Sequence, residues 1–118
     1  MTIKEVADIF KISEHTIRYY EKEGMISNVE RKNNIRNYSE DNLNRIEFIV
    51  CMRNAGVSIE ALKKYIALYE IGEGTEIERK NILINERNKL RQKVADMNKA
   101  LSRLEYKINN YDELLNRK

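Results

Sequence analysis

The side chains in this sequence that best suit a nucleic acid are arginines and tyrosines in two short clusters. One cluster is Arg18-Tyr19, preceded by Glu14, His15 and Thr16, and the other is Arg36 with Tyr38. A guanidinium donates in a planar fork that fits a phosphate or the edge of a guanine, and a tyrosine hydroxyl can bond a phosphate oxygen. The clusters therefore predict DNA contacts. The alternative is a solvated arginine beside a packed aromatic ring, as on many helices.

The sequence offers little material for catalysis or for a metal site. Cys51 is the only cysteine and His15 the only histidine, which excludes an internal disulfide and a cysteine-cluster zinc site. There is no glycine-rich phosphate loop and no Ser/His/Asp set. We therefore expect neither an enzyme nor a bound cofactor or metal.

Cys51 leaves two interpretations open. Apolar neighbours in sequence favour a small buried thiol of the core, the commonest state of a lone cysteine. The alternative is a thiol that reacts with electrophiles, which requires partial exposure.

Short helices must position the first cluster. An apolar stripe after the capping residue Thr2 predicts the first helix: Ile3, Val6, Ala7 and Phe10. A connector of three residues, 11–13, follows, and Ser13 caps a second helix that runs through Lys22 and ends at Gly24. In this second helix we expect Ile17 and Tyr20 to face the core. Two short helices joined by a tight turn are typical of a helix-turn-helix.

A small basic hairpin is expected to carry the second cluster. Met25-Ile26 is a candidate short strand, residues 31–34 form the turn, and residues 35–38 form the return strand. A hairpin after two helices indicates a winged helix-turn-helix, whose second helix enters the major groove. Two further helices are predicted, one from the cap Ser39 to Gly56 and one after the cap Ser58.

The last third of the chain predicts one long helix, residues 76–115. An apolar seam follows heptad spacing for more than four heptads, interrupted once by arginine: Leu83, Arg87, Leu90, Val94, Met97, Leu101, Leu104, Ile108, Tyr111 and Leu115. The preceding 74 residues cannot cover such a stripe, so the seam predicts a homodimer. The seam alone leaves parallel and antiparallel pairing open. The predicted organisation is a mainly α chain, with a winged helix-turn-helix domain at 1–74 and a coiled-coil dimerisation helix at 75–118.

Composition agrees with this organisation. The 118 residues include 35% charged and 42% hydrophobic residues, no proline and a net charge of +3. No stretch approaches the roughly 20 apolar residues of a membrane span, and no signal sequence begins the chain. We therefore expect a cytoplasmic protein without a membrane partner. The net charge by itself is too small to indicate a nucleic-acid partner.

Several segments resemble the MerR family of bacterial transcription regulators. Thr16–Ile26 reads TIRYYEKEGMI, which resembles the family's recognition-helix signature TIRYYEKxGLL. Arg36–Ser39 is similar to its wing end, and residues 41–49 and 53–59 are similar to the helix and joint that follow. At the wing tip, Asn33-Asn34-Ile35 stands where the family commonly has Asn-Gly-Tyr.

The resemblance implies specific roles and partners. Recognition-helix contacts would come from His15, Thr16, Arg18 and Tyr19, with Tyr20 at most a partial contact, and wing-phosphate contacts from Arg36 and Tyr38. Family members bind palindromic promoters as antiparallel-coil dimers and distort the spacer DNA, which affects RNA polymerase indirectly. A coiled-coil interaction protein without a DNA function is the alternative.

The resemblance also bears on what the protein senses. The chain has no room after the coil for a large drug-binding domain, and no cysteine follows Cys51, so metal sensing of the family's usual type is not expected. Residues 48–56 resemble the NmlR/AdhR-type branch, whose members respond to carbonyl electrophiles or nitrosative stress through a cysteine at this place. The resemblance thus implies a stress-response regulator with Cys51 as its sensor.

Overall fold

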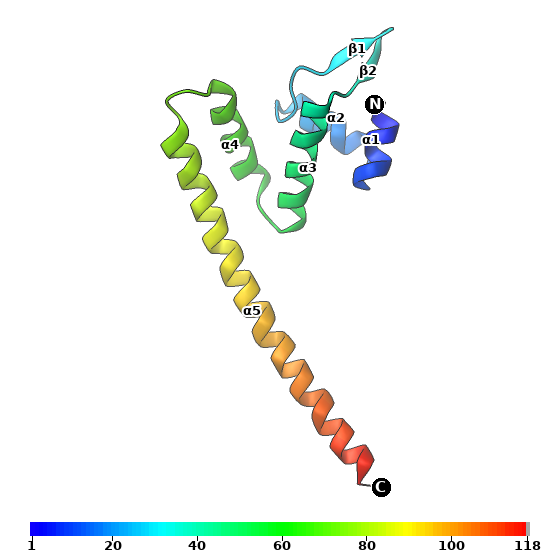
Figure 1. The fold of residues 1–118 in the computed structure, drawn as a ribbon, viewed down its shortest axis with the longest axis vertical. Helices are drawn as coiled ribbons and strands as arrows, with labels where there is room; N and C mark the ends of the chain where they lie inside the picture. Colours follow the sequence, from blue (N-terminus) through cyan, green and yellow to red (C-terminus); the bar gives the residue numbers. More distant parts are fainter. Residues whose placement is uncertain (118) are drawn as a thin grey trace. The chain divides into compact units, whose positions relative to one another are not determined.

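The computed structural model describes residues 1–117 and is mainly helical (Figure 1). In chain order its elements are α1 (Ile3–Phe10), α2 (Glu14–Lys22), β1 (Glu30–Lys32), β2 (Ile35–Asn37), α3 (Glu40–Asn54), α4 (Ile59–Ile71) and α5 (Glu76–Asn116). The chain divides into two compact units, a head of Met1–Ile82 and the part of α5 from Leu83 onward. The first two turns of α5 therefore belong to the head. This architecture confirms the predicted fold class of a helix-turn-helix with a small wing and a long C-terminal helix.

Local capping signals fix where the helices of the head begin. The Oγ1 of Thr2 accepts from the backbone N–H of Glu5, whose carboxylate accepts in return from the N–H of Thr2. Ser13, Ser39 and Ser58 each accept a backbone N–H from the residue three positions on. These bonds satisfy N–H groups that have no partner within the helix. The caps predicted from the sequence are thereby confirmed.

The core of the head gathers residues from every helix up to α4. Its buried side chains are Val6, Ala7, Ile17, Tyr20, Met25, Ile26, Tyr38, Ile46, Ile49, Val57, Leu62 and Ile66. Removing this apolar surface from water is the main stabilising contribution to the head.

The expectation of a strand at Met25-Ile26 was wrong. Both side chains are 1% exposed and lie in the core directly after α2, without a strand pairing. Gly24, just after the end of α2, takes a φ of 76°. The first strand instead begins four residues later, at Glu30. The two apolar residues are therefore explained by burial under the helices and not by a sheet.

The wing is a two-stranded antiparallel hairpin with a tight turn. β1 pairs with β2 so that Lys32 faces Ile35. The two turn residues, Asn33 and Asn34, have φ values of 54° and 65°. Two successive positive φ values suit the right-handed twist of a hairpin, and asparagine tolerates them better than most residues. The return strand is confirmed over Ile35–Asn37. The turn predicted over residues 31–34 is limited to Asn33 and Asn34, because Arg31 and Lys32 already pair in β1.

The single chain leaves the apolar seam of α5 uncovered. No residue of this helix is buried within the described range, and side chains such as Leu101, Leu104 and Ile108 are more than half exposed. At 1.5 Å per residue the 41 residues of α5 extend for about 60 Å. Among the described residues, no helix is long and apolar enough to cross a membrane.

Candidate nucleic-acid interface

The second helix of the helix-turn-helix, α2, turns one polar face outward. His15, Arg18 and Tyr19 are exposed, and Thr16 is half-buried with its hydroxyl 2.8 Å from the Oγ of Ser13. The guanidinium of Arg18 lies 3.7 Å from the carboxylate of Glu14, one turn earlier. A solvent-exposed pair of this kind is weak, so Arg18 can exchange its partner for a phosphate or a base at little cost.

The opposite face of α2 fixes the helix in the core. Ile17 is fully buried and Tyr20 is 6% exposed, with the Tyr20 ring tilted against that of Tyr19 at 6.0 Å between centroids. The structure therefore places Tyr20 as a core residue that supports Tyr19. Its partial role at the DNA stays a prediction.

An ion pair joins the wing to α2. The Nε of Arg36 on β2 donates to Oε2 of Glu21 on α2 at 2.8 Å, and both side chains are less than a third exposed. Partial burial makes such a pair stronger than a surface pair, because water screens it less. The pair holds the second cluster beside the first. Sequence reasoning missed Glu21 as a partner of the wing, because its only signal was its place one turn after Ile17 on the same helix.

Tyr38 is buried too deeply for its hydroxyl to contact a phosphate directly in this conformation. It is 2% exposed, and its hydroxyl has no hydrogen-bond partner among the described residues. Burial raises the pKa of this hydroxyl, and the nearby carboxylate of Glu21 raises it further. The hydroxyl therefore remains a neutral donor at physiological pH. The predicted phosphate contact through Tyr38 stays a prediction and would require the buried hydroxyl to become accessible.

The N-terminus clamps the end of the wing. The amino group of Met1 donates to Oδ1 of Asn37 at 3.0 Å and to the carbonyl of Tyr38 at 3.2 Å. The backbone N–H of Tyr38 in turn donates to the carbonyl of Met1 at 2.8 Å. These three bonds tie the return strand to the start of α1. The wing is thus held at both α1 and α2.

The interpretation of Cys51 as a buried core thiol was wrong. The residue is exposed on α3. The core-facing positions of that helix are taken by Asn42, Ile46 and Ile49, so Cys51 falls on another face. The guanidinium of Arg53, two positions after Cys51, donates to the carbonyl of Val57 at 2.7 Å. Within residues 1–117 no group of three or more histidine, cysteine, aspartate or glutamate side chains could hold a metal ion.

These features define a winged helix-turn-helix head, a class of DNA-binding module. Two family models match the chain: the MerR HTH family regulatory protein model over residues 1–68 and the MerR DNA-binding model over residues 43–106. The chain belongs to the MerR family of transcription regulators, which are not enzymes.

Relatives and solved structures agree with this assignment. The chain is 50% identical over 91 residues to the HTH-type transcriptional regulator AdhR of Bacillus subtilis, covering 76% of this chain and 65% of AdhR. The chain thus spans somewhat less than two thirds of that relative. A MerR-family crystal structure from Listeria monocytogenes superimposes with a TM-score of 0.87 at 41% identity, covering 95% of this chain and 86% of the other.

A second solved structure was determined with DNA. HiNmlR, described as a MerR family regulator lacking the sensor domain and bound to promoter DNA, superimposes with a TM-score of 0.83 at 29% identity. The match covers 95% of this chain and 90% of HiNmlR.

Proposed function

We propose that two copies of this chain bind a palindromic promoter element, with α2 of each copy in the major groove and each wing on the flanking phosphates. The observation that carries this proposal is the arrangement of the head. Arg18 and Tyr19 are exposed on α2, and the bond from Arg36 to Glu21 fixes the basic wing beside them. Phosphate contacts from both elements would set the register of the head on the duplex.

The seam of α5 supports the dimer. Its apolar side chains are exposed in the single chain, and a continuous heptad pattern buries such side chains against a second helix. Antiparallel pairing, as in the resemblance to the family, places the two heads at opposite ends of the coil. Two heads at a fixed distance recognise two half-sites at a fixed spacing.

Distortion of the DNA is the proposed route to regulation. If the half-site spacing and the separation of the heads do not match in straight DNA, the duplex must bend or twist to engage both heads. A promoter with an overlong spacer between the polymerase boxes would become a better substrate for RNA polymerase in this way. The polymerase is then an indirect partner.

A gel-shift experiment with Arg18→Ala tests DNA binding. The probe is double-stranded DNA from upstream of the protein's own gene, titrated over a range of salt concentrations. Loss of one phosphate or base contact should weaken binding by about 1–3 kcal/mol per head and, where the contact is to phosphate, lower the salt slope by about one per head.

Lys99→Ala is the matched control, because it removes the same charge from an outward position of α5, between the seam residues Met97 and Leu101. Its affinity should equal that of the unchanged protein. A dimer that shifts no DNA would instead support a coiled-coil interaction protein.

We further propose that Cys51 senses reactive electrophiles. Its exposure supports this, because only an accessible thiolate can attack a carbonyl carbon. In that step a sulfur–carbon bond forms as the carbonyl π bond breaks, the oxygen takes a proton from water, and the hemithioacetal can revert. The protein would then be a stress-response regulator.

A further inference from the structure

We propose that Tyr69, Arg45 and Arg79 form a positioning relay that couples the start of α5 to the segment entering the wing. The proposal rests on the DNA-binding function proposed above. In the dimer, the relay would restrict the angle at which α5 leaves each head. It would thereby restrict which half-site spacings the two heads accept.

The centre of the relay is one aromatic ring shared by three helices. The Cζ of Arg45 on α3 lies 5.4 Å from the centroid of the Tyr69 ring on α4, and the Cζ of Arg79 on α5 lies 5.3 Å from it. Both distances fall within the range of about 6 Å in which a guanidinium is attracted to a ring. The two arginine side chains are only 21% and 19% exposed, whereas Tyr69 is 52% exposed, so water screens these contacts in part.

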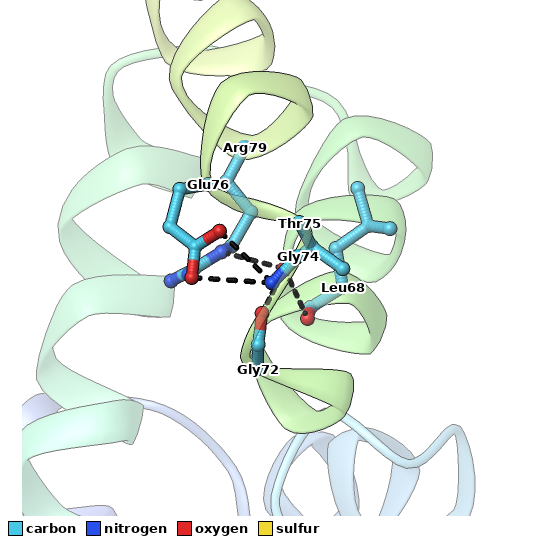
Figure 2. Close-up of polar contacts among 6 residues, drawn as sticks. All are labelled: Leu68, Gly72, Gly74, Thr75, Glu76 and Arg79. Carbon is cyan, nitrogen blue, oxygen red and sulfur yellow. Dashed lines mark hydrogen bonds and ion pairs between the residues drawn. The ribbon is translucent and has the colours of Figure 1, made fainter.

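On the α5 side, Arg79 is fixed to the corner between α4 and α5 (Figure 2). The hydroxyl of Thr75 bonds the carbonyls of Leu68 at 3.0 Å and Gly72 at 2.6 Å, and the Nε of Arg79 donates to this hydroxyl at 2.9 Å. The guanidinium also lies 3.6 Å from the carboxylate of Glu76. A change in the path of the corner therefore moves Arg79 relative to the ring.

On the wing side, Arg45 holds the segment between α2 and β1. Its guanidinium donates to the carbonyl of Met25 at 3.1 Å and to the carboxylate of Glu70 at 3.1 Å. The same carboxylate accepts from the hydroxyl of Ser27 at 3.3 Å, and the amide of Asn42 donates to the carbonyl of Ser27 at 3.0 Å. The segment that enters the wing is thus bonded to the partners of the Tyr69 ring.

These contacts form a continuous path from the start of α5 to the segment that enters the wing. A contact path couples two sites only if changing it shifts the preferred arrangement at both ends. Without the ring, Arg79 and Arg45 lose their shared partner, while the hydrogen bonds at each end remain. We therefore expect a wider range of head positions and a weaker preference for one spacing.

The test compares three variants on a set of operators. The unchanged dimer first selects a palindrome from a random pool of double-stranded DNA, and the affinity is then measured for that operator and for versions with one or two base pairs added or removed between the half-sites. Tyr69→Leu removes the ring, and Tyr69→Phe keeps it. Tyr65→Leu is the matched control, because its ring packs between Phe48 and Tyr69 without a guanidinium over it among the described contacts.

We expect Tyr69→Leu to lower the ratio of affinities between the best and the altered spacings by about two- to fivefold, the size of cation–π contacts at a partly exposed site. Tyr69→Phe and Tyr65→Leu should keep the ratio. Arg79→Met, which removes one guanidinium, should lower it as well and replaces Tyr69→Leu if that variant folds poorly.

Equal ratios for Tyr69→Leu and the unchanged protein would overturn the relay alone, as would an equal loss in Tyr65→Leu. If the unchanged dimer selects no sequence, the proposed DNA-binding function fails, and the role of the relay in spacing fails with it.

Discussion

Arg36 is fixed at the edge of the wing by one bond that leaves part of its guanidinium unoccupied. Its Nε is bound to Glu21, but a guanidinium carries five N–H donors, and its terminal nitrogens have no hydrogen-bond partner among the described residues. The bond to Glu21 therefore orients the side chain without consuming it. A phosphate could be received by the free edge of a guanidinium that is already held in place, which lowers the entropy lost on binding.

Replacing the thiol of Cys51 should separate sensing from DNA binding. Cys51→Ser should keep DNA affinity within about twofold, because surface substitutions away from special features change little. The promoter's response to an added aldehyde should disappear, because a serine hydroxyl is not ionised at neutral pH. The measurement is promoter activity with and without formaldehyde in cells that carry each variant.

Cys51→Ala serves as the control, since it removes the thiol without adding a hydroxyl, and it should match Cys51→Ser. A full aldehyde response in both variants would end the sensing proposal. The DNA-binding proposal would be untouched by that result.

At the scale of elements, the sequence predicted the helices better than the strands. Helix starts were readable because Thr2 and Ser13 cap through bonds to residues only three positions on. β1 was missed because its three residues, Glu30–Lys32, are exposed and charged and carry no alternating pattern. Met25 and Ile26 misled in the opposite direction, since their burial depends on helices distant in sequence.

The same limit applies to side chains that act between elements. The exposed cluster on α2 followed from helical spacing, but the partners Glu21 and Arg36 are 15 positions apart, and Arg45 and Glu70 are 25 apart. No local pattern announces such pairs. The burial of Cys51 was wrongly favoured because α3 carries more apolar residues than its core face can take.

The stability of the wing should depend on which residue occupies the turn position of Asn34. Asn34 has a φ of 65°, where a β-branched side chain is strained. Asn34→Val should lower the free energy of unfolding by about 1–2 kcal/mol per chain, the cost of the left-handed region for such residues. Asn34→Gly should cause no loss, because glycine adopts this conformation freely. Urea denaturation at fixed protein concentration measures both, and an unchanged midpoint for Asn34→Val would contradict the turn geometry.

For the whole molecule, the decisive property is the covering of the seam. A 41-residue helix has no buried residue within the described range, so a second copy packed on the seam, as proposed above, would supply much of its stability. The heptad spacing of the sequence predicted this requirement. It could not predict pairing direction, because the seam is apolar almost throughout and places few charges that would favour one register.

Leu101→Asp tests the seam directly. An antiparallel overlap of Leu83–Leu115 has its midpoint near residue 99, so the Leu101 side chains of both copies would lie close to the two-fold axis, and two carboxylates there would be desolvated and repel each other. We expect the variant to sediment as a monomer at micromolar concentration and to lose most affinity for the palindrome. Lys99→Asp introduces the same carboxylate two positions away, on the outward face, and should remain dimeric. A dimeric Leu101→Asp variant would show that the two copies associate through some other surface. The seam of α5 would then not be what sets the distance between the two heads.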